Sequence, residues 1–556
     1  MKLVIVETPA QAKILTDALG DGWRVEPCDG FVRDLPTDKL GIDVDDDFRP
    51  TFAVVPGKGN LVRRLMKAIR ESEAVYAATP PTLAGEAMAW QALALSPDAK
   101  DKPIYRVTLP ALTPDTIRAA FATPRPLDIH LVEAEVTHRI INRVIGWSVS
   151  AGVRKAVGVK MALTHNGMVA LRLVAAHEAR IAAQPPETRW HASVTFERDG
   201  TSFTAQVLNG KGAPLALRNA EQAAQLETLL KQGMFWVDGT GQALKAHPAP
   251  DALTPPMLIE LAERDLALSP ERVLTLVETL YEAGWITHPD STPLTEVSTA
   301  AQAYIRREFG MDYAVPDVVV SSGIAPTDIS RVPEDLPSDG AALYSLVWKY
   351  FIAAHMPPAQ ERIMAARILV GSTAGNSYPL ELRATAKLLY ADGWRRILPS
   401  TVKDEVLPFL RQGDELHPAQ IAVDVVSSDA TSGYTAASLI RALAQLGTDE
   451  DTVVRAFDTL CAAEAVVVAD GKLALTESGV VLAAYLTSTF NELTSPNYAA
   501  ELITEINRIA AGERSRIDVL HAFWSRFGAA LRPTSSPSPL TVGEHKPVVL
   551  RPAEEV

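Results

Sequence analysis

The stretch AVYAATPPTLAGEAMAW, residues 74–90, sets the fold class of the N-terminal part of the chain. Residues 74–78 are apolar and prone to form a strand, and the segment from Gly85 onward has helical spacing of its apolar residues. A strand, a tight loop and a helix in this order are where α/β proteins place chemistry, because the loop lies at the carboxyl end of the sheet. Yet the loop TPPTLA, residues 79–84, has no charged side chain, no cysteine and no histidine. The loop therefore lies where a catalytic site is expected but has none of the side chains that such a site needs.

The segments on both sides of this stretch alternate between strand and helix patterns. KLVIVE, TFAVVP and AVYAAT have the apolar character of buried strands, while PAQAKILTDAL and NLVRRLMKAIRES have helical spacing. Such alternation is typical of βαβ units on a mostly parallel sheet. We therefore expect an α/β domain over residues 1–150.

The rest of the chain changes pattern several times, and a β-rich region occurs twice, on either side of a helical one. Segments with helical spacing, alternating strands or a Pro/Ser-rich composition predict a helical domain in 151–186 plus 430–530, a β-rich arch in 187–250 plus 366–429, a second helical domain in 251–365, and a disordered tail in 531–556. This order suggests a helical domain carried on two β arms, as in a hinged arch.

Composition excludes several classes of protein. The 556 residues carry a formal net charge of −14, which argues against a surface that is basic throughout but leaves a local basic groove open. Two cysteines, Cys28 and Cys461, are too few for a disulfide scaffold or a cysteine-based zinc ribbon. We find no apolar run of the roughly 20 residues that cross a bilayer, and the N-terminus has the pattern of a first strand rather than of a signal peptide. We expect a cytoplasmic protein with no membrane association.

Five further segments carry a resemblance to a known family, in the same order along the chain. They are LVIVETPAQAKIL (3–15), DGFVRDLPTDKLGIDVDDDFRPTFAVVPGK (29–58), LYEAGWIT (280–287), APTDIS (325–330) and GYTAASLIRALAQLG (433–447). They resemble VIVESPAKAKTI, GHVRDLP…LGVDVENDFEP…VIPGK, LYEGGYIT, the end of EAIRPTDVS, and RYTEASLVKALEEKG of the type IA DNA topoisomerases, the bacterial topoisomerase I branch. With residues 74–90, these matches cover nearly the whole chain.

The resemblance implies a multidomain α/β plus α+β fold. A Toprim α/β domain (1–150), a helical domain that bears the nucleophile (251–365), a β-rich gate arch and a further helical domain would form a type IA topoisomerase-like toroid. Members of the family cut one DNA strand with a tyrosine, pass another strand through the break and reseal it, with Mg²⁺ on Toprim carboxylates.

The opening stretch departs from the family at this metal site. The family has ATDPDREGEAIAW, so its three carboxylates fall at Pro80, Thr82 and Ala84 of this chain. A hard cation such as Mg²⁺ needs oxygen ligands, preferably charged, placed where phosphodiester oxygens develop charge. Proline and alanine have no side-chain oxygen and threonine has a neutral one. We therefore expect no metal site and no cofactor.

The nucleophile segment also departs from the family. The family's ITYMRTDST becomes ITHPDST (286–292), which places His288 at the tyrosine and shortens the segment by two residues. A histidine can attack phosphorus. Because Pro289 follows in a shortened loop, we expect its geometry to be wrong for this attack. Tyr281, on the preceding helix, matches a scaffold position.

Other positions that the resemblance places near the DNA cleft have changed as well. The family's arginines and histidines are replaced at Phe31, His138, His165, Ser321 and Ala325. Acids in GTDEDT (447–452) stand where a phosphate-facing arginine would be.

Six residues that match the family in this region remain. The resemblance gives Glu7 and Lys13 as remnants of the catalytic set, and the candidates for binding nucleic acid are Arg33, Lys58, Arg139 and Arg143. A structural role is open for each. Glu7 ends a strand, where an acid favours the N-terminus of the next helix, and single surface cations are more often solvated than functional.

The combined loss of triad, tyrosine and arginines predicts a catalytically inactive protein that acts by binding. Its partner would be single-stranded DNA or a protein in a DNA-processing complex, with no small-molecule substrate, and the acidic total favours the protein. One alternative is an active type IA topoisomerase with an altered site, which needs acids from elsewhere. The dense acidic run IDVDDDF (42–48) is nearby but matches an ordinary family segment. An enzyme of changed mechanism is the third interpretation.

Overall fold

The computed structural model describes most of the chain. The described residues are 1–531 without 159–162, 184–187, 210, 214, 216, 218, 292–294, 316–319, 321–322, 332, 334–335, 374, 400–403, 428–432 and 449. The expected tail, apart from Leu531, and the changed position Ser321 lie outside them. In the described part, no helix combines the length and the apolar character that crossing a membrane requires.

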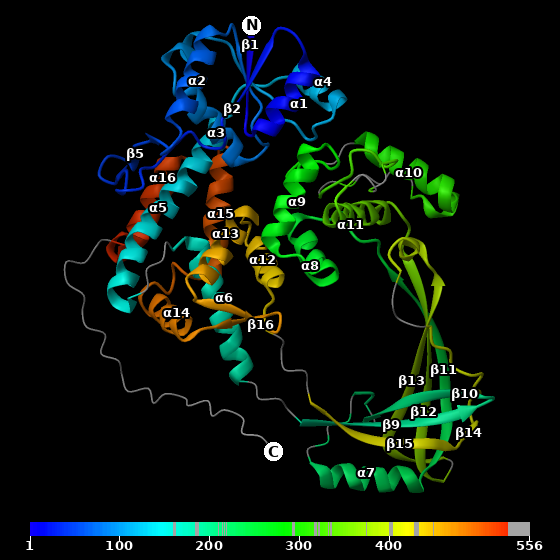
Figure 1. The fold of residues 1–556 in the computed structure, drawn as a ribbon. Coiled ribbons are helices and arrows are strands. Elements are labelled where there is room, and N and C mark those ends of the chain that lie inside the picture. Colours follow the sequence, from blue (N-terminus) through cyan, green and yellow to red (C-terminus); the bar gives the residue numbers. More distant parts are fainter. Residues whose placement is uncertain are drawn as a thin grey trace.

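The N-terminal domain is a parallel four-stranded sheet between two layers of helices (Figure 1). Strand order is β2-β1-β7-β8. The strands are β1 (Lys2–Val6), β2 (Trp23–Pro27), β7 (Val75–Ala77) and β8 (Ile104–Arg106); the helices are α1 (Pro9–Leu19), α2 (Gly59–Glu71), α3 (Leu83–Leu93) and α4 (Pro114–Ala122), with the 3₁₀ helix η1 (Pro97–Asp101). Two short hairpins, β3 (Arg33–Asp34) with β6 (Ala53–Val54) and β4 (Ile42–Asp43) with β5 (Arg49–Pro50), extend from it.

The sequence of β1 explains why this sheet is covered on both faces. Leu3 and Ile5 pack with the apolar side chains of α2 and α3, whereas Val4 and Val6 belong to the core that includes Leu15 of α1. All four side chains are fully buried. A continuous apolar strand of this kind is typical of a parallel sheet that is buried on both faces.

A large helical domain follows. It consists of α5 (Ile129–Val157), α6 (His165–Ala183), α12 (Ala436–Ala444), α13 (Glu450–Ala462), α14 (Glu477–Thr489), α15 (Pro496–Ala510) and α16 (Arg516–Leu531), with the hairpin β16 (Val466–Ala469)–β17 (Lys472–Leu475). The long helix α5 packs against α3 of the N-terminal domain and also against α15 and α16. The expected border at residue 150 falls within this helix, which therefore joins the two domains rigidly.

The β-rich arch is one antiparallel sheet of seven strands, in the order β14-β11-β12-β13-β10-β9-β15. Figure 1 shows its long strands rising from the curled sheet toward the second helical domain. The elements are β9 (Thr188–Arg198), β10 (Thr201–Asn209), α7 (Ala220–Gln232), β11 (Met234–His247), β12 (Ala359–Thr373), β13 (Asn376–Ala391), β14 (Glu415–Leu416) and β15 (Pro418–Ser427). Its apolar core is separate from that of the helical domains.

The second helical domain is inserted between β11 and β12. It contains α8 (Pro255–Leu266), α9 (Pro270–Glu282), α10 (Thr295–Phe309), η2 (Met311–Tyr313) and α11 (Ser338–Ala354), and the 3₁₀ helix η4 (Gly393–Arg396) follows β13 beside it. Arg441 of α12 pairs with Glu260 of α8 at 2.7 Å, which connects the two helical domains. The side chain of Glu282 accepts a hydrogen bond from Thr8 of the N-terminal domain. The four parts therefore form the ring-like arrangement in Figure 1.

Candidate functional site

The loop between β7 and α3 is closed by contacts of its own. Thr82 caps α3, because its hydroxyl accepts a hydrogen bond from the backbone N–H of Gly85 at 2.9 Å. The hydroxyl of Thr79 donates to the carbonyl of Gly85 at 2.6 Å. A Cβ at position 85 would lie 2.0 Å from the carbonyl oxygen of Pro80, so only glycine fits there. The single side-chain oxygen at the three changed positions is thus engaged as a helix cap.

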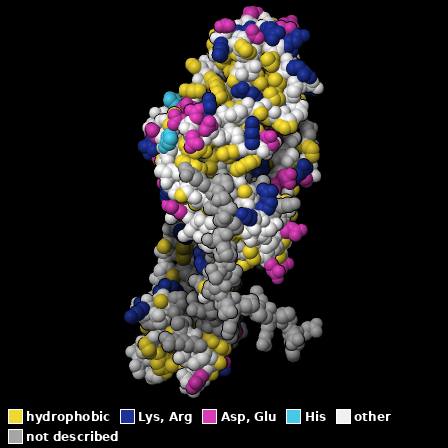
Figure 2. Space-filling model, turned by 90° about the vertical axis from the view of Figure 1, so that its left-hand side faces the viewer, with side chains coloured by type: hydrophobic (Ala, Val, Ile, Leu, Met, Phe, Trp, Pro, Cys, Tyr) yellow, Lys and Arg dark blue, Asp and Glu magenta, His cyan; other side chains and the backbone are white. Residues whose placement is uncertain are grey.

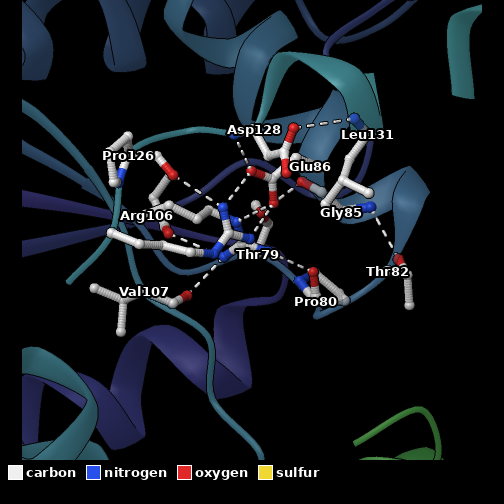
Figure 3. Close-up of polar contacts among 12 residues, drawn as sticks. Thr79, Pro80, Thr82, Gly85, Glu86, Arg106, Val107, Pro126, Asp128 and Leu131 are labelled. Carbon is white, nitrogen blue, oxygen red and sulfur yellow. Dashed lines mark hydrogen bonds and ion pairs between the residues drawn. The ribbon is translucent and has the colours of Figure 1, made fainter. Parts of the chain in front are cut away.

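A buried cluster of charges lies under this loop (Figure 3). The carboxylate of Glu86 is 1% exposed and the guanidinium of Arg106 is 0% exposed, with Nε 2.8 Å from Oε2. Arg125 approaches the same carboxylate with two nitrogens, at 2.8 and 2.7 Å. The backbone N–H of Asp128 donates to Oε1 at 2.7 Å. Four hydrogen bonds from three residues therefore converge on one carboxylate.

The remaining donors of Arg106 hold the loop backbone. Nη2 donates to the carbonyl of Pro80 at 2.6 Å, and Nη1 donates to the carbonyls of Ala77 and Val107 at 3.0 and 2.6 Å. A guanidinium offers five donors in a rigid fork, so one buried arginine can fix several carbonyls at once. Arg106 thus fixes the backbone of the loop through contacts within the chain.

The pKa of Glu86 reflects these contacts. Burial alone would raise it, but the hydrogen bonds from Arg125, from the backbone of Asp128 and from Arg106, together with the Arg106 charge, outweigh burial and lower it below its ordinary value. Glu86 is therefore ionised at neutral pH. Its oxygens are consumed by hydrogen bonds, so it is not a free metal ligand.

The residues at the expected metal position do not fit Mg²⁺. Pro80, Thr82 and Ala84 bring no carboxylate, and Glu7 at the end of β1 brings one. Mg²⁺ is held by carboxylates in near-octahedral oxygen geometry. Within the described part of the chain, no three histidine, cysteine, aspartate or glutamate side chains are grouped so that they could hold a metal ion.

His288 lies where the second helical domain meets the N-terminal domain. Its backbone N–H donates to the carbonyl of Pro110 at 2.8 Å, and its ring meets that of Tyr281 edge-on, with centroids 5.0 Å apart. Burial lowers the pKa of His288 from 6.5 to about 4, so the imidazole is neutral at pH 7. The structure thus places the changed residue at the domain junction, packed rather than open.

The hydroxyl of Tyr281 also lies at this junction. Its side chain is buried, and the phenol donates to the carbonyl of Leu109 at 3.0 Å. Burial, and then the charges of Glu282 and Glu7, raise its pKa above the ordinary value. Glu7 and His288 are therefore brought together around Tyr281. A protonated, hydrogen-bonded phenol is a poor nucleophile.

The candidate cations on α5 hold a neighbouring segment in place. Arg143 donates to the carbonyls of Pro36 and Leu35 at 2.8 and 3.2 Å. Arg139 pairs with Asp34 and stacks over the ring of Phe31, 4.2 Å from its centroid. Both guanidinium groups fasten the 31–36 segment to α5.

Two of the other candidates lie at the same segment. Arg33 belongs to it and donates from Nε to the side-chain oxygen of Gln91 at 2.9 Å, and Lys58 pairs with Asp29 at 3.6 Å, just before it. Lys13 is exposed on α1. The role of these residues in binding stays a prediction.

His165 and the acidic run 42–48, which the sequence analysis singled out, make contacts within the fold. His165 is buried with Nε2 2.8 Å from the carbonyl oxygen of Leu493, and burial lowers its pKa to about 4. In the acidic run, Asp46 pairs with Arg49 at 2.8 Å and Asp47 with His521 at 2.9 Å. Figure 2 shows acidic side chains and histidines gathered on that outer face.

The Glu86, Arg106 and Arg125 cluster was not expected from the sequence. A signal for it was present, because Glu86 is the one charged residue in the apolar helix LAGEAMAWQAL. An acid in such a position requires a buried partner. The partners could not be named, since they come from β8 and from the segment before α5.

Comparisons with known proteins agree with this geometry. The family model described as DNA topoisomerase matches residues 126–521, and the model of the Toprim domain matches residues 2–112. The solved structure of full-length topoisomerase I from Thermotoga maritima is similar in fold, with a TM-score of 0.86 at 23% sequence identity, over 96% of this chain and 91% of that chain. The toroidal fold expected from the sequence is confirmed. The chain belongs to the type IA DNA topoisomerase family and carries that family's Toprim domain at its N-terminus.

Proposed function

We propose that this family member is catalytically inactive and acts by binding DNA. Membership of a family that acts on DNA supports DNA as the partner, although the acidic total charge favours a protein. The observation that carries the loss of activity is the loop after β7. Pro80, Thr82 and Ala84 stand at the metal-binding positions, and Arg106 and Glu86 fix the loop from below. The loop thus keeps its shape while offering no charged oxygen to a cation.

The junction with the second helical domain supports the same conclusion. Strand cleavage by this family needs a tyrosine that can attack phosphorus. Here the His288 side chain is 14% exposed and neutral, and its Nδ1 accepts a hydrogen bond from the backbone N–H of Asp290 at 3.2 Å. The hydroxyl of Tyr281 is buried and donates to the carbonyl of Leu109. The Nδ1 lone pair is therefore occupied, and the phenol stays protonated.

A relaxation assay tests the loss of activity. The protein is incubated with negatively supercoiled plasmid and Mg²⁺, and we expect neither relaxed topoisomers nor a covalent DNA adduct. Relaxation or an adduct that disappears in the double variant Glu7→Gln, His288→Ala would overturn the proposal and favour an active enzyme with an altered site. Residual activity that survives in this variant identifies a contaminating enzyme.

Calorimetry tests the metal directly. One carboxylate at Glu7 binds water-rich Mg²⁺ weakly. We expect no heat of Mg²⁺ binding in the submillimolar range. A site of that affinity which is lost in Glu7→Gln contradicts the proposal.

Binding of single-stranded DNA tests what the protein does instead. Replacing Arg33, Lys58, Arg139 and Arg143 by glutamine is expected to weaken binding without sequence preference, and to lower the slope of log affinity against log salt by about 0.7 for each lost phosphate contact with a single strand. The melting temperature of the variant is measured beside it, because Arg139 and Arg143 also hold the 31–36 segment. A wild-type protein that binds no single strand at low salt favours a protein partner instead.

A further inference from the structure

A cavity lies where the β arch joins the second helical domain. It is a partly open pocket with a volume of about 460 Å³, lined by the C-terminal end of α8, by α11 and by residues 394–399 after β13. This volume is within the range of about 300–1,000 Å³ that is usual for sites of small ligands. The elements meet at the upper end of the arch in Figure 1.

The wall formed by η4 is fixed in position. Gly393 has φ +48°, and a Cβ there would lie 2.5 Å from the carbonyl oxygens of Pro357 and Pro358. The indole N–H of Trp394 donates to the carbonyl of His247 at 3.0 Å. These contacts hold the indole before any ligand arrives, which reduces the entropy lost on binding.

Charged groups support the same wall. The guanidinium of Arg395 is 15% exposed, pairs with Glu361 at 2.6 Å and lies over the ring of Trp394 at 5.6 Å from its centroid. Glu361 also contacts His247 at 2.8 Å. The guanidinium of Arg395 therefore lies over the Trp394 indole, and its charge is balanced by the carboxylate of Glu361.

The part of the lining that comes from α11 offers a second ring and a free cation. Tyr350 of α11 is half-buried, and Arg264 beside it is bound through two nitrogens to Asp265, at 2.6 and 2.7 Å. Lys349 is exposed and lines the cavity. No ion pair to Lys349 is found among the residues that the structure describes, so its ammonium group is available to an anion.

We propose that this cavity binds one nucleotide unit of a single DNA strand. The base stacks on Trp394 or Tyr350, and the phosphate is bound by Lys349. Two rings and a free cation, in a site the size of a small ligand, are the combination that recognises a nucleotide without reading its sequence. The inference rests on the DNA binding proposed above and gives it a location. Since the walls come from two parts of the ring, a bound strand connects the arch to the second helical domain.

Fluorescence anisotropy of a labelled oligothymidylate tests the proposal with the full chain. The loss of a base-stacking ring in Trp394→Leu is expected to weaken binding roughly 5- to 150-fold. Lys349→Glu is expected to weaken binding and to lower the slope of log affinity against log salt by about 0.7. The control is Lys231→Glu, which makes the same charge change on α7 at the far end of the arch and also breaks a pair with Glu227 at 2.7 Å, so its melting temperature is measured too.

Two further measurements keep the result interpretable. Melting temperatures show whether Trp394→Leu still folds, and Lys349→Glu tests the cavity independently because its side chain has no ion pair to lose among the described residues. Quenching of tryptophan fluorescence by the oligonucleotide should diminish in Trp394→Phe, which keeps a ring for stacking.

The outcomes separate this cavity from the wider proposal. If the wild type binds but Trp394→Leu and Lys349→Glu bind equally well, the cavity is not the site, and DNA binding stands. If the wild type binds no oligonucleotide, both fail, while inactivity in the relaxation assay is unaffected. Competition by thymidine monophosphate with an affinity equal to that of the strand assigns the cavity to free nucleotides and overturns the strand proposal.

Discussion

Glu86→Gln is the substitution that most directly tests how the loop keeps its shape. The carboxylate accepts four hydrogen bonds, from Arg106, twice from Arg125 and from the backbone of Asp128. In glutamine an N–H₂ group replaces one of the two carboxylate oxygens. This group is a hydrogen-bond donor, and it would face the N–H donors that the oxygen accepted from. It also leaves the fully buried Arg106 charge without its closest counter-charge. Removing one partner of a buried pair destabilises a protein by about 3–5 kcal/mol.

Hydrogen exchange measures this loss where it arises. The whole chain has several domains, so a single free energy of unfolding is poorly defined for it. The free energy of local opening, which hydrogen exchange measures, is well defined. A loss of about 3–5 kcal/mol corresponds to exchange roughly 150- to 5,000-fold faster, at about 1.4 kcal/mol for each factor of ten. We expect this increase in peptides that cover residues 77–90 and 104–107, and no change in β12 of the arch.

Arg125→Gln is the matched control. The Arg125 side chain is 39% exposed, and its loss leaves Glu86 paired with Arg106. Solvent can replace part of the hydrogen bonding at this partly exposed position, so the effect should be smaller than that of Glu86→Gln, although two hydrogen bonds to a buried carboxylate are lost. If Glu86→Gln exchanges as slowly as the wild type, the buried cluster does not hold the loop, and the reasoning fails.

The acid dependence of the same peptides follows from the pKa of Glu86. Because this pKa is lowered in the folded protein, the cluster's contribution to stability is complete above the unfolded pKa of about 4.3 and is lost as pH falls through the folded value. Exchange of the wild-type loop should therefore accelerate below about pH 4 after correction for the intrinsic rate. Glu86→Gln should lack this step.

Three further predictions concern the site. The triple variant Pro80→Asp, Thr82→Asp, Ala84→Glu should bind Mg²⁺ in calorimetry, because it places the three carboxylates of the family's motif at this loop; no gain over the wild type would show that the loop does not have the geometry of a metal site. Since burial lowers the pKa of His288 from 6.5 to about 4, the protein should lose stability as pH falls across that window, and His288→Gln should reduce this loss in melting curves taken at both ends of it. Tyr281→Phe should lower stability by about 1 kcal/mol, because the Leu109 carbonyl loses its donor, and should leave any strand binding unchanged in anisotropy.

The order of strands and helices in the N-terminal domain could be predicted because its apolar pattern is local. Strand β1 reads LVIV and is buried on both faces, and the stretch from Ala74 to Trp90 forms the expected strand, loop and helix. The toroid could not be predicted from periodicity. It followed from resemblance, because the contacts that close the ring, such as the pair between Glu260 and Arg441, join residues far apart in the sequence.

The environment of the candidate cations was beyond sequence reasoning for a similar reason. The two-residue strands β3 and β6 have no detectable pattern, yet they fold the 31–36 segment back onto α5. Only this return brings Arg139 to Asp34 and Arg143 to the carbonyl of Pro36. Residue type and spacing give a cation's position on a helix, whereas its partner is determined by the tertiary fold.

The energetics of the loop explain how its shape can persist without the metal-binding groups. Carboxylates at positions 80, 82 and 84 would repel one another in the absence of a cation, so their loss removes an unfavourable interaction. The buried residues of the cluster behave differently from positions 80, 82 and 84. A side chain at Gly85 would clash with the Pro80 carbonyl, and replacing Glu86 or Arg106 leaves the other charge buried and unpaired. Substitutions at the first set therefore cost the fold little, whereas substitutions at the second set are destabilising. Glu86 on α3 binds Arg106 of β8 and the backbone of Asp128 at the start of α5, and α3 packs against α5, so this cluster joins the Toprim domain to the rest of the ring.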